Sequence, residues 1–177
     1  MKLKQMDIEK IVVTFLIGVL SLEPTANFFA NASQEDAKVG VYYYIWWGLP
    51  PPFPNKWEYT KYTPFLGQYN SSDPLTADRH ILWAKQHGID FFAVSWLGIW
   101  NWYDHHYIDS NLKNGFLESE YLSNFNFCLF YESEIVLKAI LNATLSASEF
   151  PRVFLDDMAY AAENYFVNPS YLKIDEK

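Results

Sequence analysis

Three apolar runs divide the chain from residue 39 onward, at residues 39–47, 89–96 and 125–131. Each run is short, rich in β-branched or aromatic side chains, and nearly continuous instead of alternating with polar positions. Such runs are typical of parallel strands that are covered on both faces. The pattern therefore predicts three parallel strands at these places.

Helical patterns separate the three runs. Asp73 followed by Pro74 is a strong helix start, because a carboxylate caps the free amides and proline suits the first helical position. Gly88 ends this helix just before the second run. A weaker helical pattern covers part of residues 104–117. Two more helices are predicted after the third run, at 134–145 and 152–166, with Pro151 between them.

The order strand, helix, strand, helix, strand, helices predicts a parallel α/β fold, either an open doubly wound sheet or a closed barrel. Residues 48–52 follow the first run and read Gly-Leu-Pro-Pro-Pro. A dinucleotide-binding sheet would have a glycine-rich phosphate loop there. The sequence therefore lacks the main signature of that open sheet.

The first 32 residues predict a signal peptide or an N-terminal anchor. Lys2 and Lys4 precede an apolar run at residues 11–20, which is shorter than the roughly 20 residues of a membrane-spanning helix. Residues 30–32, Ala-Asn-Ala, are suited to cleavage before Ser33. We expect a secreted or extracytoplasmic protein, with residues 33–38 as a polar linker and 39–177 as the folded domain. An uncleaved anchor or a core helix is the alternative for the apolar run.

Composition narrows the choice of partner. The 177 residues are 50% hydrophobic and 19% aromatic, and their formal net charge is −8. The acidic balance argues against nucleic acid and against an anionic membrane surface, so no lipid ligand is expected beyond the possible anchor. A neutral glycan is compatible with an acidic, aromatic-rich protein. The single cysteine, Cys128, is expected to be a buried structural thiol.

Aromatic and acidic residues follow the predicted strands where a parallel α/β fold binds its ligand, at the carboxyl ends. Aromatic rings stack on the apolar faces of sugars, and glycosidic cleavage uses paired carboxylates. The candidate substrate-binding residues are Tyr44, Trp46, Trp47, Trp96 and Tyr131, and the candidate carboxylates are Glu132 and Glu134.

Structural alternatives exist for these residues. Trp46 and Trp96 could pack inside the fold, and the two glutamates could be a solvated helix start, where acidic side chains favour the positive end of the dipole. Asp104, His105 and His106 are a weak metal motif because adjacent histidines point in different directions and no further ligand accompanies them. We predict no metal and no cofactor.

The same stretches resemble glycoside hydrolase family 99, the endo-α-mannosidases and endomannanases. The matching residues are 42–48, 64–74, 88–98, 130–132 and 165–174, in the family's order and spacing. The last of these resembles the family's lead-in to its fourth strand. Leu97 departs from the pattern, because members commonly have a second tryptophan there.

The resemblance implies the N-terminal portion of a (β/α)8 barrel, about three βα units long, that cleaves internal α-mannosidic bonds with retention. In the family, a carboxylate is thought to deprotonate the sugar's 2-hydroxyl, which forms a 1,2-anhydro intermediate. Glu132 and Glu134 would then have supporting or sugar-binding roles. The main catalytic pair is expected beyond Lys177, so a downstream polypeptide would complete the barrel. A non-catalytic glycan-binding module and a structural α/β protein without a sugar site are the alternatives.

Overall fold

The computed structural model describes residues 37–48, 55–100, 105–142 and 145–174. Contacts divide the chain into two units, Met1–Ala37 and Lys38–Lys177, and nearly all described residues belong to the second. The predicted signal segment at residues 1–32 lies outside the described residues, as does most of the predicted linker. Within the described part of the chain, no helix is both long and apolar enough to span a membrane.

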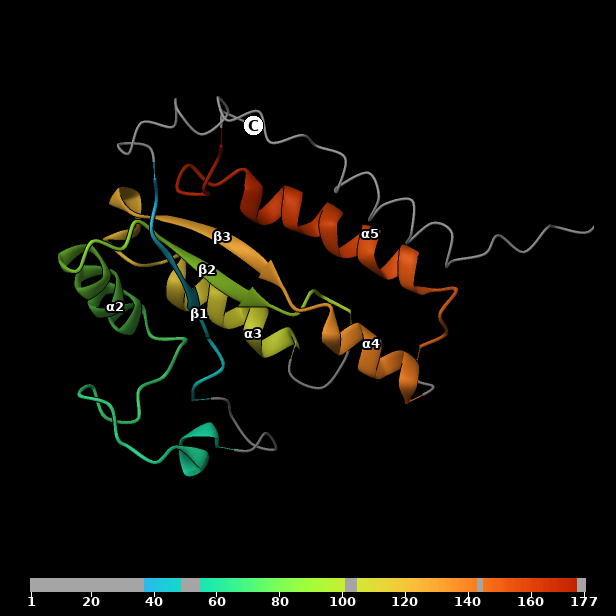
Figure 1. The fold of residues 1–177 in the computed structure, drawn as a ribbon, viewed down its shortest axis with the longest axis horizontal. Helices are drawn as coiled ribbons and strands as arrows, with labels where there is room; N and C mark the ends of the chain where they lie inside the picture. Colours follow the sequence, from blue (N-terminus) through green and yellow to red (C-terminus); the bar gives the residue numbers. More distant parts are fainter. Residues whose placement is uncertain (1–36, 49–54, 101–104, 143–144, 175–177) are drawn as a thin grey trace, which may run out of the picture. The chain divides into compact units, whose positions relative to one another are not determined.

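The fold is built on a three-stranded parallel sheet (Figure 1). Strands β1 (Gly40–Tyr43), β2 (Phe91–Trp96) and β3 (Asn126–Tyr131) lie in the order β1-β2-β3. Tyr43 pairs with Val94, and Trp96 pairs with Tyr131. The three predicted strands and their parallel direction are confirmed, and consecutive strands are neighbours, as in a barrel.

The first helix, α2 (Pro74–Gln86), begins as its sequence predicts. The Asp73 carboxylate accepts a hydrogen bond from the Leu75 amide at 3.0 Å, and Pro74 occupies the first turn. Gly88 follows the helix with φ of 72°, a left-handed conformation that glycine adopts without steric cost. The chain is thereby turned back toward β2.

The later helices differ from the prediction in their ends. Helix α3 (His105–Asn111) runs into a π-helical turn at Leu112–Phe116. Helices α4 (Glu134–Leu141) and α5 (Phe150–Ala161) follow β3, and α5 continues as a π-helical turn at Ala162–Phe166. Pro151 was predicted to lie between two helices, but it lies in the first turn of α5. Proline is tolerated there because the first amides of a helix have no partner within it.

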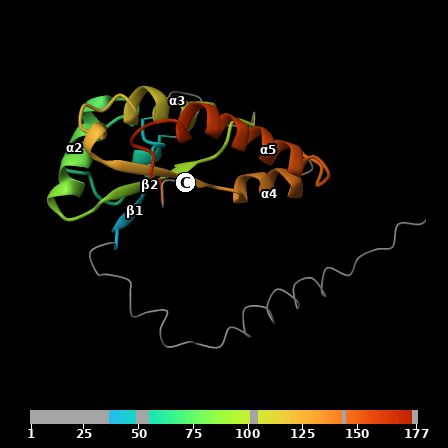
Figure 2. The same ribbon diagram turned by 90° about the horizontal axis from the view of Figure 1, so that it is seen from above.

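One face of the sheet carries the hydrophobic core. Helices α2, α3 and α5 all lie on this side, as the view from above shows (Figure 2). We call it the helix-covered face. Its strand residues alternate with those of the other face and include Phe92, Val94, Trp96 and Phe127, all at most 4% exposed. Helices and turns contribute further buried side chains, namely Ala77, Ile81, Ala84, Ile108, Leu112, Phe116, Ala161 and Tyr165.

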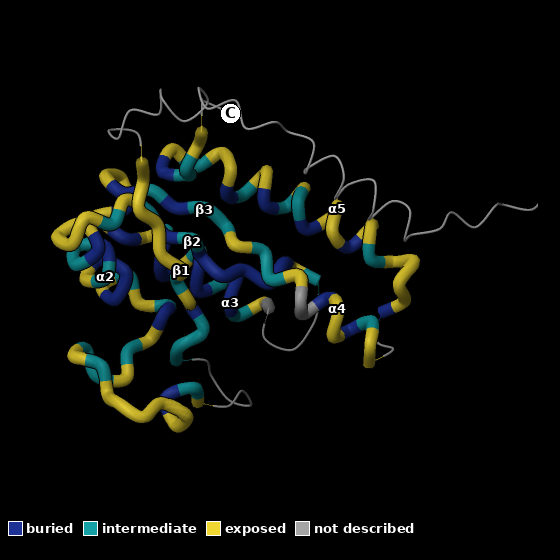
Figure 3. The backbone as a smooth tube through the Cα atoms, viewed as in Figure 1, coloured by how far each residue is buried: buried dark blue, intermediate teal, exposed yellow. Residues whose placement is uncertain are grey.

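The opposite face of the sheet, which we call the open face, is only partly covered. It carries Tyr42, Phe91, Ala93, Cys128 and Phe130, and Tyr42 and Phe130 remain 62% and 37% exposed. The rings of Tyr42 and Phe130 meet edge to face at 4.9 Å between centroids. Figure 3 shows the exposure of β1. The near-continuous apolar runs predicted strands covered on both faces, and the described residues cover only one.

An isolated parallel bridge extends the sheet beside β3. Tyr171 forms a parallel bridge with Phe127. The Phe127 amide donates to the Ser170 carbonyl at 3.0 Å, and the Leu172 amide donates to the Phe127 carbonyl at 2.6 Å. The sheet is therefore continued past β3 in the same direction, which agrees with the predicted lead-in to a fourth strand.

Candidate functional site

The residues that follow β1 form an aromatic surface at the carboxyl end of the sheet. Tyr44 and Trp46 stack with ring centroids 4.4 Å apart and an interplanar angle of 25°. Tyr44 is 38% exposed and Trp46 is half-buried. The ammonium group of Lys56 lies 6.0 Å from the Trp46 ring. Two stacked rings open to solvent on one side can accept the apolar face of a sugar.

Trp47 lies beside this stack but is held by other contacts. Its ring stacks on that of the buried Trp57 at 4.0 Å. The Trp57 indole in turn donates to the Tyr69 carbonyl at 3.0 Å. The Trp47 amide also donates to the Ser71 hydroxyl at 3.3 Å. Trp47 therefore anchors the loop after β1, and its half-buried ring leaves less area for a ligand than that of Tyr44.

Glu132 lies at the carboxyl end of β3 next to the end of β2. The Ser95 hydroxyl donates to Oε1 of Glu132 at 2.8 Å, and Ser95 is 1% exposed. The Glu132 amide donates to the Trp96 carbonyl at 2.9 Å, so both its side chain and its backbone are tied to β2. Tyr44 directly follows Tyr43, the partner of Val94, and so lies level with Ser95. The aromatic stack and the Glu132 carboxylate therefore share one end of the sheet.

Glu134 is the first residue of α4. Its side chain lies outside the described part of the structure, so its predicted role stays a prediction.

Trp96 and Tyr131 were predicted to bind substrate, but the structure places them on the helix-covered face. Trp96 is fully buried, and its indole donates to the Asp109 carboxylate at 3.0 Å. Tyr131 packs against Trp96 and Phe154. Because Trp96 and Tyr131 are register partners, they point to the same side of the sheet, opposite to Ser95. For Trp96, the structure thus corresponds to the packing alternative.

Two buried aspartates from the helices hold the carboxyl ends of β2 and β3. Asp109 of α3 accepts hydrogen bonds from Trp96 and from the hydroxyls of Tyr160 and Tyr165. Asp157 of α5 accepts hydrogen bonds from the Ile99 amide and the Tyr131 hydroxyl, both at 2.7 Å. Sequence reasoning missed both aspartates. The available signal was a carboxylate at apolar helical spacing, with Asp157 between Val153 and Ala161.

The tyrosines of this layer act as hydrogen-bond donors. Burial raises the pKa of Tyr131 well above its ordinary value, and the hydrogen bond to Asp157 and the charge of that carboxylate raise it further. The pKa of Tyr165 is raised for the same reasons, with Asp109 as the partner. Both hydroxyls therefore stay protonated at neutral pH and donate to the aspartates.

The metal motif at Asp104, His105 and His106 can be followed only in part. The residues that the structure describes contain no group of three or more histidine, cysteine, aspartate or glutamate side chains that could hold a metal ion. His106 is exposed, whereas Asp104 and the His105 side chain lie outside the described set. His80 packs among aromatic rings, with its Nδ1 atom 2.9 Å from the Tyr43 hydroxyl.

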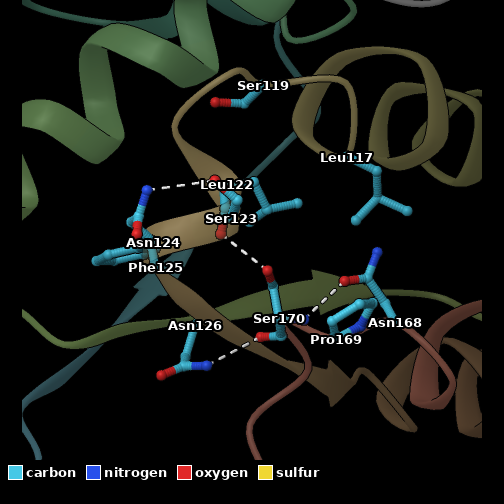
Figure 4. Close-up of a pocket in the computed structure, with 10 residues that line it drawn as sticks. All are labelled: Leu117, Ser119, Leu122, Ser123, Asn124, Phe125, Asn126, Asn168, Pro169 and Ser170. Atoms are coloured by element: carbon cyan, nitrogen blue, oxygen red, sulfur yellow. Dashed lines mark hydrogen bonds between the residues drawn. The ribbon is translucent and has the colours of Figure 1, made fainter.

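A pocket of about 530 Å³ lies at the other end of β3 (Figure 4). Leucine, phenylalanine and proline side chains line it together with serines and asparagines, and it has no charged lining residue. Several of the polar groups bond to one another: Asn126 donates to the Ser170 carbonyl at 3.2 Å, and Asn168 accepts from the Ser170 amide at 2.9 Å. Ligands of parallel α/β folds bind at the carboxyl ends of the strands. We therefore place the candidate site at the Tyr44, Trp46 and Glu132 end.

A parallel sheet with consecutive strands adjacent and helices on one face is the beginning of a (β/α) barrel. Comparison with solved structures agrees. The chain is similar to the GH99 endo-alpha-mannosidase from Bacteroides thetaiotaomicron in complex with BIS-TRIS-propane, with a TM-score of 0.56 and 19% identity over 80% of this chain and 40% of that chain. A second structure of a GH99 endo-alpha-mannosidase from the same organism gives a TM-score of 0.45 and 16% identity over 78% of this chain and 42% of that chain.

Comparisons at the sequence level add nothing to this similarity. No family model matches the chain, and no curated protein matches it. The chain spans less than half the length of the mannosidase chains to which it is similar. What the first structural match shows is the fold: a parallel α/β arrangement that corresponds to part of the barrel of that enzyme.

Proposed function

We propose that this chain contributes a glycan-binding surface to an endo-α-mannosidase-like glycoside hydrolase. The observation that carries the proposal is the pairing of a partly exposed Tyr44–Trp46 stack with a fixed Glu132 carboxylate at one end of the sheet. The stack would contact the C–H face of a mannose ring. Glu132, oriented by Ser95, would accept hydrogen bonds from sugar hydroxyls. The fold of the GH99 endo-alpha-mannosidase structure supports this choice of substrate class.

Cleavage would need groups that come from elsewhere. Glycosidic bond cleavage generally uses two carboxyl groups that flank the bond. Among the described side chains that could serve, Glu132 is the carboxylate that accompanies the aromatic stack, and Asp157 is buried with both oxygens occupied. We propose that further strands, beside β1 and beyond the bridge at Tyr171, would cover the open face and bring the catalytic pair. Because Glu132 is the carboxylate that the described side chains place with the aromatic stack, glycan binding without turnover is a second candidate function for the chain.

Sugar binding is tested by titration with α-linked mannobiose and mannotriose, followed by tryptophan fluorescence. Tyr44→Ala and Trp46→Ala should each weaken binding by about tenfold, since one stacked ring contributes about 1–1.5 kcal/mol. Tyr121→Ala is the matched control, because Tyr121 is as exposed as Tyr44, at 39% against 38%, but precedes β3 at the other end of the sheet. Equal loss of binding in Tyr121→Ala would contradict the assigned surface.

Turnover is tested by the release of reducing ends from α-mannan oligosaccharides. We expect binding without hydrolysis from the isolated chain. Glu132→Gln should weaken binding by about tenfold or more, because a hydrogen bond to a charged acceptor contributes about 1.5–3 kcal/mol. Robust hydrolysis by the isolated chain that persists in Glu132→Gln would refute the role given to this carboxylate. The absence of any fluorescence change with any glycan would favour a structural α/β protein.

A further inference from the structure

We propose that Asp157 is a positioning residue that sets the geometry of the sugar-binding end of the sheet from the helix side. This inference rests on the proposed function, because it concerns the placement of Glu132. Asp157 is 1% exposed on α5, and it reaches two different strand ends. Its Oδ1 atom accepts from the Ile99 amide at 2.7 Å, and its Oδ2 atom accepts from the Tyr131 hydroxyl at 2.7 Å.

The loop after β2 is shaped around this carboxylate. Gly98 has φ of 80°, and a Cβ atom added there would lie 2.2 Å from Oδ2 of Asp157. A side chain at position 98 would therefore collide with the carboxylate, and the positive φ would be strained for any residue other than glycine. The close approach of loop and helix leaves Asp157 little freedom to move. It can therefore transmit the position of α5 to the strand ends.

One of the two groups held by Asp157 is adjacent in the chain to the candidate site, and the other lies three residues past the end of β2. Tyr131 immediately precedes Glu132, and Ile99 follows the Trp96 carbonyl that accepts the Glu132 amide. The backbone at Glu132 therefore lies next to segments that Asp157 holds from the helix-covered face. The Glu132 side chain is held on the open face by the Ser95 hydroxyl. A carboxylate that bonds to sugar hydroxyls must be held within a few tenths of an ångström, because hydrogen bonds weaken steeply with misalignment.

Asp157 could instead serve only the stability of the fold. The two roles predict different results. If Asp157 is purely structural, replacing it would lower the fraction of folded protein but leave the affinity of the folded protein for sugar unchanged. If Asp157 is a positioning residue, replacing it would lower the affinity even at a temperature where the variant is fully folded. The replacement would also loosen the backbone at Glu132, which Asp157 does not touch.

The first experiment measures mannobiose affinity of Asp157→Asn and Tyr131→Phe in protein shown to be folded by circular dichroism. Each change should raise Kd about tenfold. The double variant should be little weaker than Asp157→Asn alone, since Tyr131→Phe removes a hydrogen bond that Asp157→Asn also alters. Asp156→Asn is the matched control: Asp156 is the neighbouring residue on α5, exposed and paired with Arg152, and its Kd should stay within twofold of the wild type. Wild-type affinity in both folded variants, Asp157→Asn and Tyr131→Phe, would overturn the proposal.

A second experiment does not depend on sugar binding. Amide hydrogen exchange is measured at Ile99 and Glu132 in the wild type, in Asp157→Asn and in Asp157→Ala. In Asp157→Ala the Ile99 amide loses its acceptor, and the Glu132 amide should also exchange at least tenfold faster than in the wild type. Faster exchange at Ile99 alone would overturn the positioning role. If the wild type fails to bind mannobiose, the proposed function fails, and the Glu132 exchange rate still decides the inference about Asp157.

Discussion

Replacing Asp109 by alanine would remove the acceptor on which three donors converge. The Trp96 indole donates to Oδ1 at 3.0 Å and the Tyr160 hydroxyl donates to Oδ2 at 2.6 Å, while Tyr165 also donates to Oδ1. Trp96 and Tyr165 are fully buried, so water cannot replace the lost acceptor without opening the core. The change therefore leaves two buried donors without a partner.

The magnitude follows from these two donors. An unsatisfied buried donor costs about 1–3 kcal/mol, so two cost about 4 kcal/mol in the middle of that range. Relief from burying a carboxylate offsets part of this cost. The ion pair with Lys113 at 3.6 Å adds little, because Lys113 is partly exposed. We expect Asp109→Ala to lower the free energy of unfolding by about 3 kcal/mol. Asp109→Asn retains one acceptor oxygen and should lose about half as much.

Urea unfolding followed by tryptophan fluorescence measures this loss, and the slope of the free energy with urea should not change between variants. Asp156→Ala is the control, since an exposed i,i+4 ion pair contributes about 0.5 kcal/mol or less. A loss below about 1 kcal/mol in Asp109→Ala would refute the assignment of Asp109 as the acceptor that satisfies the buried donors.

Two further predictions concern stability. Gly98→Ala should lower the free energy of unfolding by about 3 kcal/mol, because it combines a positive φ with a collision against Asp157. Gly88→Ala, with φ of 72° and open space around its Cβ, should lower it by about 1 kcal/mol. Urea midpoints that fall equally in the two variants would contradict this. Burial lowers the pKa of His80, so the unfolded chain binds a proton more readily than the folded one, and stability should fall as the pH drops below about 6.5. His80→Gln should flatten this decline between pH 7.5 and pH 5, and an unchanged decline in His80→Gln would contradict the assignment.

The strands and the first helix could be predicted from the sequence because their signals are local. Three short apolar runs predicted β1, β2 and β3, and Asp73-Pro74 with Gly88 predicted both ends of α2. A capping carboxylate and a left-handed glycine act on neighbouring residues, so no tertiary contact is needed to recognise them. The position of Pro151 was predicted wrongly because proline is common both between helices and in the first turn of a helix, and the local sequence does not distinguish the two.

Which side chains reach the site was decided by the tertiary structure. A continuous apolar run does not show which alternate positions face the helices, so the sequence could not decide whether Trp96 faces a ligand or packs against the helices. Asp109 and Asp157 meet their partners across 13 to 58 residues of sequence, a distance at which no local pattern links them. The sequence by itself determined a parallel α/β chain with aromatic and acidic residues after its strands. Only the packing of α3 and α5 against one face decided that Trp96 and Tyr131 lie on the helix-covered face, while Tyr44, Trp46 and Glu132 form the candidate site at the carboxyl ends of the strands.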